Sequence, residues 1–197
     1  MIMEKLVNSI FEEITETNSR FFARSKNTII SISLEIAKTF INGGKILLLG
    51  NGGSAADSQH IAAEFINRFK MERPPLPALA LTTDTSVITS ISNDYDFKDI
   101  FVKQLVAIAN EGDVVWALST SGNSPNVIRA LQYAAKNNLK SVGFTGNKGD
   151  KMLGLCDILL AAPTDNTPRI QELHITSAHI ICELVDELMF GKFTDNL

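Results

Sequence analysis

Residues 45–54 read KILLLGNGGS, and this stretch decides the fold. A short, wholly apolar run leads into a glycine-rich loop, and a helical pattern of apolar residues follows over residues 54–69. Apolar runs of this length, bounded by glycines, are typical of strands that are buried on both faces of a parallel sheet. The stretch therefore predicts a buried strand that leads through a tight loop into a helix.

The same alternation continues to the end of the chain. Further apolar runs predict strands at residues 78–81, 113–118, 141–145 and 157–161. Helical spacing predicts helices at residues 85–92, 99–110, 124–137 and 167–190. Alternating strands and helices indicate an α/β fold, in which helices cover both faces of a parallel sheet of five strands.

Residues 1–42 precede this unit and are predicted to be helical. Their apolar residues recur at four-residue spacing, as at Leu6, Ile10 and Ile14, and the polar group at residues 25–27 predicts a break between two helices. Helices that lie outside a sheet must bury their apolar stripe elsewhere, and another copy of the chain is the simplest partner. We therefore expect residues 1–42 to take part in oligomerisation.

Composition narrows the class of protein. The chain has 197 residues and a net charge of −4, and no linker or low-complexity tract divides it, so we expect a single domain over residues 1–197. Charged residues make up 20% of the chain, against about 25% in typical soluble domains, which also favours surface buried between subunits. The acidic balance argues against a nucleic-acid partner. No apolar run reaches the roughly 18 residues that cross a bilayer and no signal peptide is visible, so we expect a cytoplasmic protein with no membrane contact.

Two loops are built alike. GNGGS at residues 50–54 follows the first strand, STSGNS at residues 119–124 follows the third, and a helix begins after each. Ligands of open parallel sheets bind outside the carboxyl ends of the strands, where both loops must lie. Glycines let the backbone approach a ligand, helix N-termini offer free N–H groups to an anion, and hydroxyl groups add neutral donors. The two loops together predict a site for a phosphate or a polyhydroxylated molecule.

Two other interpretations compete with this one. The first loop satisfies the G-x-G-x-x-A form of the dinucleotide-binding fingerprint, but the acidic residue expected about 20 positions later is missing, since Asp84 comes too late. In the second interpretation, Ser54 and Ser124 bind no ligand and serve only as the N-caps of their helices. The second loop has hydroxyl groups in excess of what one cap requires, and a dinucleotide has no use for them. The missing acidic residue and the additional hydroxyl groups both favour a ligand other than a dinucleotide.

A metal site is a further candidate. His60 and Glu64 are four residues apart on the helix after the first loop and share a face, while Gln171, His174 and His179 lie on the last helix. Gln171 and His179 differ by about 80° around that helix and can converge, whereas His174 and His179 are about 140° apart. Two ligands from each helix would complete a tetrahedral zinc site, which leaves His174 as a structural residue.

Together these motifs resemble those of the phosphoheptose isomerases, in the sugar-isomerase (SIS) superfamily. The likeness covers nearly the whole chain and includes, besides the two loops, RIQE at residues 169–172, ERP at residues 72–74 and SND at residues 92–94. It implies a SIS-type three-layer αβα sandwich and a homotetramer with active sites at subunit boundaries. It also implies isomerisation of sedoheptulose 7-phosphate, a phosphorylated seven-carbon sugar, to D-glycero-D-manno-heptose 7-phosphate, the first step toward the heptose of bacterial lipopolysaccharide.

The resemblance also implies roles for individual residues. The implied substrate-binding residues are Asn51, Gly52, Gly53, Ser54, Asn93, Asp94, Ser119, Thr120, Ser121, Ser124 and Gln171, with the serine-rich loop holding the phosphate. The implied zinc ligands are His60, Glu64, Gln171 and His179, with one ion per subunit. An enediol mechanism needs a base that takes the proton from C1 and an acid that serves the oxygens, and we expect Glu64 as the base and His179 as the acid.

A non-catalytic protein of the same fold is the alternative. The chain is also similar to the bacterial replication-initiator-associating proteins, notably at INRF, residues 66–69. Those proteins lack part of the metal and catalytic set, so the presence of Glu64 and His179 favours the enzyme. A sensor that binds a sugar phosphate without converting it is a third interpretation.

Overall fold

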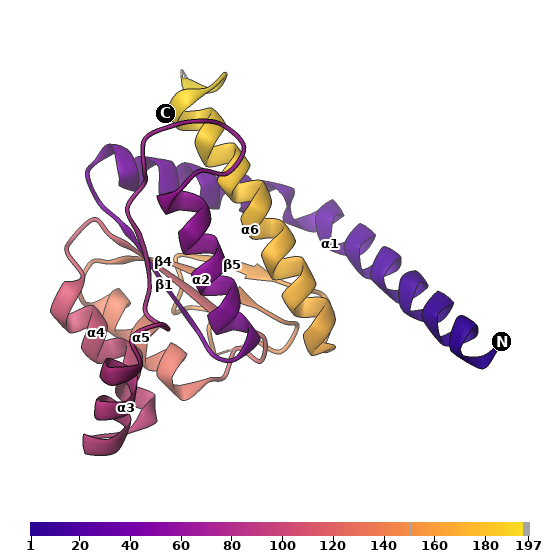
Figure 1. Ribbon diagram of the computed structural model, residues 1–197, viewed down its shortest axis with the longest axis horizontal. Helices are drawn as coiled ribbons and strands as arrows, with labels where there is room; N and C mark the ends of the chain where they lie inside the picture. Colours follow the sequence, from indigo (N-terminus) through magenta and orange to yellow (C-terminus); the bar gives the residue numbers. More distant parts are fainter. Residues whose placement is uncertain (150, 195–197) are drawn as a thin grey trace.

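A computed structural model of the chain describes residues 1–149 and 151–194. After one long N-terminal helix, strands and helices alternate (Figure 1). The elements are α1 (Ile2–Ile41), β1 (Ile46–Gly50), α2 (Gly53–Ile66), β2 (Ala78–Ala80), α3 (Thr85–Asp94), the 3-10 helix η1 (Phe97–Asp99), α4 (Ile100–Ile108), β3 (Val114–Ser119), α5 (Pro125–Lys136), β4 (Lys140–Thr145), β5 (Ile158–Ala161) and α6 (Thr167–Phe190). The predicted α/β fold is confirmed.

The sheet is parallel throughout, with strand order β2-β1-β3-β4-β5. Strand β1 shows why its sequence is wholly apolar. Ile46 and Leu48 pack with α1, α2 and α6 on one face, whereas Leu47 and Leu49 pack with α4 and α5 on the other. Because both faces are covered, no position of the strand reaches water, and the molecule has the predicted three layers.

The strand order places the two glycine-containing loops together. β1 and β3 are neighbours, with β2 on the far side of β1 and β4 and β5 on the far side of β3. The loops that leave the carboxyl ends of β1 and β3 therefore begin side by side. Ligands of open parallel sheets bind at such a topological switch point.

The prediction of two N-terminal helices is wrong, because α1 runs unbroken for 40 residues. Ser25 continues the buried stripe, four residues after Phe21 and four before Ile29. Residues 25–27 contain neither proline nor glycine, so nothing in the backbone ends the helix there. The second half of α1 packs against α6, and Glu13 accepts a bond from the Asn166 amide at 2.7 Å, whereas residues 2–12 project from the domain (Figure 1).

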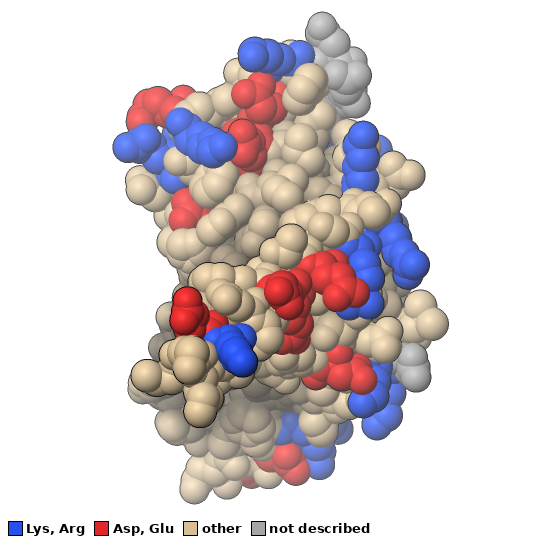
Figure 2. Space-filling view, turned by 90° about the vertical axis from the view of Figure 1, so that its right-hand side faces the viewer, with Lys and Arg blue, Asp and Glu red and all other residues tan. Residues whose placement is uncertain are grey.

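The surface carries mixed charge. On the face shown in Figure 2, small groups of acidic and basic side chains are interspersed among uncharged residues, and neither sign gathers into a large patch. Within residues 1–149 and 151–194, no helix combines the length and the apolar character that crossing a membrane requires.

Candidate active site

The first loop connects β1 to α2 and depends on two glycines. Gly52 has φ +56°, a conformation that residues with a Cβ rarely adopt, and it forms the N-cap of α2. The side-chain amide of Gln171 lies against Gly53, in the space that a Cβ would need. The prediction that Ser54 is an N-cap is wrong, because the turn at Gly52 starts α2 earlier and places Ser54, buried, within its first turn.

The second loop follows β3 and is held by its own hydroxyl groups. The Ser119 hydroxyl donates to the Ser124 hydroxyl at 3.2 Å, and the Ser121 hydroxyl accepts a bond from the Asn123 N–H. Ser124 occupies the N-cap position of α5, as predicted, but its side chain does not bond to the first N–H groups of the helix. Pro125 has no N–H and the Val127 N–H donates to Oδ1 of Asn126 at 2.9 Å, so the first turn keeps one main-chain donor, the Asn126 N–H, without a partner among the described residues.

Asn51 joins the two loops. Its side-chain amide exchanges two hydrogen bonds with the amide of Asn126, at 2.9 and 2.8 Å. Asn126 lies buried in the first turn of α5. Sequence reasoning missed it, because only the strand order brings it beside Asn51. The pair fixes the spacing of the loops, and contact between Asn51 and a substrate stays a prediction.

A cavity of about 180 Å³ lies beside the second loop. Its lining residues are Thr120, Ser121, Asn123, Lys148, Asp165, Thr167 and Ile170. The lining thus combines the serine-rich loop with the segment after β4 and with the first turn of α6. Its volume and its neutral donors suit a phosphate group.

A second group of polar side chains lies between α2 and α6. The Nε2 atom of His60 is 2.9 Å from Nε2 of His179 and 3.4 Å from Oε1 of Glu64. All three ligand atoms lie within 4.8 Å of one another. In a tetrahedral zinc site with bonds of about 2.0–2.1 Å, neighbouring ligand atoms are about 3.3 Å apart. These three residues could hold a metal ion, and their donor types and spacing fit zinc.

The structure does not bring every predicted site residue to this cluster. Gln171 precedes His179 by about 12 Å along the axis of α6, and its amide lies at the first loop instead. Asn93 and Asp94 lie at the end of α3, where the Asn93 amide donates to the Asp94 carboxylate at 2.8 Å. Among the described residues no hydrogen bond links them to the two loops. A fourth ligand from Gln171, and substrate contacts from Asn93 and Asp94, stay predictions.

The surroundings of the cluster set its protonation. Burial lowers the pKa of His179, His60 lowers it further, and Glu64 acts in the opposite direction. A neutral imidazole is the form that binds a metal.

Asp57 and His174 lie outside the cluster. Asp57, one turn before His60 on α2, was not predicted; burial raises its pKa, and its Oδ2 atom is buried with no hydrogen-bond partner among the described residues. His174 lies apart, buried, with Nε2 3.1 Å from the Thr145 carbonyl, in line with the structural role that we expected.

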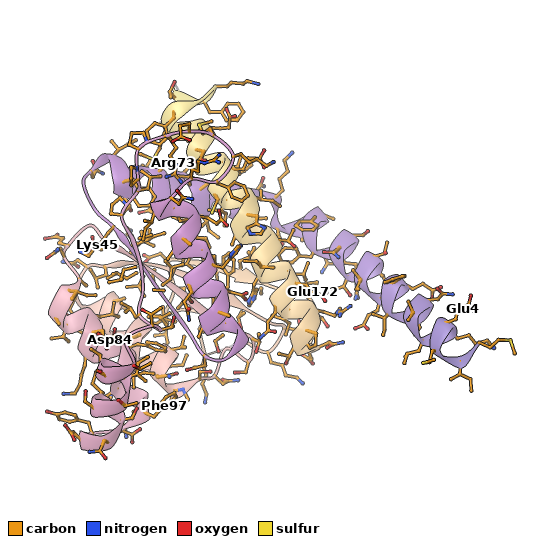
Figure 3. The ribbon with its side chains drawn as sticks, in the orientation of Figure 1. Glu4, Lys45, Arg73, Asp84, Phe97 and Glu172 are labelled. Atoms are coloured by element: carbon orange, nitrogen blue, oxygen red, sulfur yellow. The ribbon has the colours of Figure 1, made fainter. Side chains whose placement is uncertain are left out.

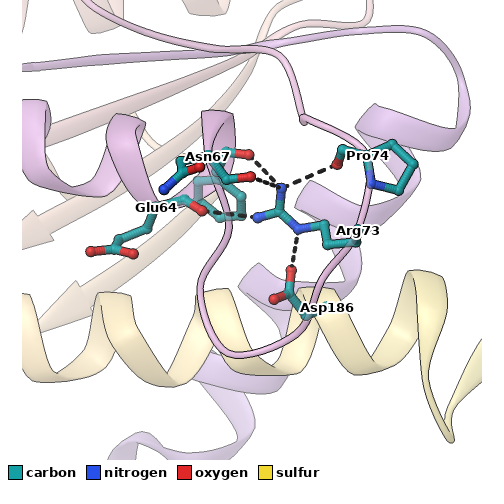
Figure 4. Close-up of polar contacts among 6 residues, drawn as sticks. Glu64, Asn67, Arg73, Pro74 and Asp186 are labelled. Carbon is teal, nitrogen blue, oxygen red and sulfur yellow. Dashed lines mark hydrogen bonds and ion pairs between the residues drawn. The ribbon is translucent and has the colours of Figure 1, made fainter.

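Arg73 fastens the end of α2 to α6. Its guanidinium lies 2.8 Å from Asp186, and both side chains are buried. The same group donates to the carbonyl oxygens of Glu64, Phe65, Asn67 and Pro74 (Figure 4). Figure 3 shows Arg73 in the layer of α2 and α6. Because α2 carries His60 and Glu64 and α6 carries His179, this contact holds together the two helices on which the cluster depends.

The parallel sheet, the paired loops and the fold comparisons define a sugar-isomerase domain: the SIS domain family matches residues 10–146. A phosphoheptose isomerase of Thermodesulfovibrio yellowstonii is 50% identical over 96% of this chain and 94% of its own length. The solved structure of a phosphoheptose isomerase from Neisseria gonorrhoeae has a TM-score of 0.89 and 38% identity, and the match covers 94% of this chain and 99% of that one. The structure of a phosphoheptose isomerase from Francisella tularensis has a TM-score of 0.91 and 36% identity, and the match covers 95% of this chain and 100% of that one. The chain belongs to the phosphoheptose isomerase family, and it is an isomerase. The non-catalytic alternative is not favoured.

Proposed function

We propose that the chain converts sedoheptulose 7-phosphate to D-glycero-D-manno-heptose 7-phosphate, with one zinc ion per subunit, in the cytoplasm, as the first step toward the heptose of lipopolysaccharide. The observation that carries the proposal is the His60–Glu64–His179 cluster, in a chain 50% identical to a phosphoheptose isomerase. The cluster supplies a carboxylate and imidazoles where proton transfer between neighbouring carbons requires a base and an acid.

In this proposal Glu64 takes the proton from C1 of the sugar. Its Oε1 atom faces His60, whereas Oε2 makes no hydrogen bond or ion pair with a described residue. One carboxylate oxygen can therefore remain a ligand while the other accepts the proton. The main-chain carbonyl of Glu64 accepts a bond from Arg73 at 2.9 Å, which fixes the end of the helix that presents the carboxylate.

His179 serves the oxygens in the same proposal. Once C1 has lost its proton, the oxygen on C2 must gain one, and the proposed donor is the Nδ1–H of His179, on the ring nitrogen that does not face His60. The ring of Phe69, with its centroid 5.4 Å from that of His179, covers one side and restrains its orientation. Bound zinc would polarise the substrate carbonyl and stabilise negative charge on its oxygen.

The phosphate is proposed to bind at the second loop. Ser119, Thr120, Ser121 and Ser124 provide hydroxyl groups, and the Asn126 N–H at the start of α5 adds a main-chain donor. The cavity beside this loop and the cluster both border α6, so the sugar chain would extend along that helix from its phosphate to its reacting end.

We also propose that the chain assembles into a homotetramer through α1. Residues 2–12 project as a helix with exposed apolar side chains, among them Leu6 and Phe11, which are 59% and 60% exposed. A helix of this length is marginal in water by itself, so the stripe gains stability when a second copy covers it.

The decisive experiment is incubation of the purified protein with sedoheptulose 7-phosphate, with and without added zinc, followed by separation of the two heptose phosphates. Formation of the aldose, lost on chelation and restored by zinc, is the expected result. Tight binding of the sugar phosphate without product under both conditions would instead identify a sensor.

A further inference from the structure

The segment after β4 lies against the serine-rich loop. The Gly146 N–H donates to the Thr120 carbonyl at 3.0 Å, and a Cβ on Gly122, which has φ +62°, would collide with the Gly149 backbone. Lys148 lies between Gly146 and Gly149 in the sequence and lines the cavity of about 180 Å³. It is the only cationic side chain in that lining.

The partner of Lys148 is a carboxylate from the same lining. Its Nζ atom is 2.9 Å from Oδ2 of Asp165, and the two side chains are 74% and 47% exposed. Asp165 precedes α6, whose N-cap, Asn166, makes no side-chain bond to the helix. The lysine and its carboxylate therefore line one cavity together with the loop that precedes α5 and with Thr167, the first residue of α6.

We propose that Lys148 is a phosphate-binding residue, held by Asp165 while the cavity is empty and transferred to the phosphate of the sugar when it arrives. The proposal rests on the proposed use of the serine-rich loop as the phosphate site. The four-carbon stem of lysine lets its ammonium group move between two acceptors that are a few ångströms apart. A phosphate dianion carries more charge than a carboxylate and receives helix N–H donors as well, so it is the stronger acceptor.

Asp165 then acts as an internal competitor. It neutralises the lysine in the empty site and repels the incoming phosphate, so it lowers affinity while keeping the ammonium group in place. The two residues must therefore have opposite effects on phosphate binding. An ion pair that only stabilises the loop predicts effects of the same sign.

The test is calorimetric titration of the full chain with inorganic phosphate at low ionic strength. We expect Lys148→Met to raise the dissociation constant about tenfold, as loss of one charge-assisted hydrogen bond does. We expect Asp165→Asn to lower it about threefold, through removal of a nearby like charge. Added salt should shrink both changes.

The matched control is Lys140→Met. Lys140 pairs with Asp157 at 3.6 Å and lies at the amino end of β4, whereas the loop leaves the carboxyl end of the neighbouring strand β3. Its loss changes the net charge equally and should leave phosphate binding as in the parent. If Lys148→Met behaves like this control, or if Asp165→Asn also weakens binding, the proposal is overturned.

Ser121→Ala separates this inference from the proposed function. If Ser121→Ala weakens phosphate binding while Lys148→Met does not, the loop holds the phosphate and the role of the lysine is wrong. If Ser121→Ala binds as the parent does while Lys148→Met and Asp165→Asn shift as expected, the lysine role stands and the proposed role of the loop is wrong.

Discussion

His60 and His179 are 119 residues apart in the sequence, yet their Nε2 atoms lie 2.9 Å from each other. Two imidazole nitrogens at this distance either share a proton or bind one metal ion. Since Glu64 adds a third donor, we expect His60→Ala to weaken zinc binding by at least about 100-fold, because one of three converging ligands is lost. Zinc content after dialysis against a buffered zinc solution measures the change.

The control for this substitution is Gln59→Ala. Gln59 is the exposed neighbour of His60 on α2 and faces about 100° away from it. It should retain zinc as the parent does. Equal zinc content in the His60→Ala and Gln59→Ala proteins would show that the three side chains do not form the metal site.

Glu64→Gln removes the proposed base while conserving the shape of the side chain. We expect kcat for sedoheptulose 7-phosphate to fall by about 10²–10⁴, the range that a positioned general base contributes, with an unchanged melting temperature. The assay includes excess zinc, so that a loss of metal affinity alone is compensated. Glu72→Gln, at an exposed residue whose side chain is 88% accessible, is the control. Near-normal turnover of Glu64→Gln would exclude the carboxylate as the base.

Asp186→Ala should be among the most destabilising single changes in the chain. It leaves the buried guanidinium of Arg73 without its counter-charge, and breaking such a pair costs about 3–5 kcal/mol. Urea unfolding at one fixed protein concentration measures the loss. Glu183→Gln is the matched control, because Glu183 pairs with Lys70 at 2.8 Å between the same two segments but in solvent; its cost should stay below about 1 kcal/mol. A similar decrease in the free energy of unfolding in both variants would show that burial does not make the Arg73–Asp186 pair more important for stability than an exposed pair.

The fold was predictable wherever burial leaves a regular pattern. β1 is apolar at every inward position, and α6 was predicted with both of its ends, Thr167 and Phe190. The continuity of α1 was missed because a buried serine, Ser25, looks like a break in a pattern of apolar residues. Hydrophobic periodicity records the chemistry of a side chain, whereas burial depends on what packs against it.

The candidate site was predictable where spacing along one helix fixes it. His60 and Glu64 share a face of α2 because they are four residues apart. Contacts between distant segments left no such signal: Arg73 meets Asp186 across 113 residues, and Lys148 meets Asp165 between a loop and the start of α6. These pairs are set by the packing of whole elements, which local sequence does not encode.

His174 gives the folded state a pH dependence. Burial lowers its pKa to about 4 from an ordinary value of 6.5, while its bond to the Thr145 carbonyl opposes the shift. Between these values the unfolded chain binds a proton that the folded chain does not. Stability is therefore complete above about pH 6.5 and is lost as the pH falls toward 4, by about 3 kcal/mol in all.

His174→Gln tests this, since glutamine can donate to the same carbonyl but does not titrate. The parent should lose about 2–3 kcal/mol more than the variant between pH 7 and pH 4.5, as measured by urea unfolding at each pH. Parallel losses in the two proteins would show that another group causes the acid sensitivity.

Charged substitutions in the projecting part of α1 should disrupt the proposed homotetramer. Leu6 and Ile10 lie one turn apart on one side of the helix, and Glu4 marks its exposed end in Figure 3. The double substitution Leu6→Glu and Ile10→Glu places two charges in the stripe, and we expect the protein to sediment as a smaller species at micromolar concentration, because buried unpaired charges oppose association. Asn8→Glu adds a charge on the opposite side of the same helix and should leave the assembly intact. If the double variant sediments like Asn8→Glu, the stripe is not the interface, and the apolar residues of this helix need another explanation.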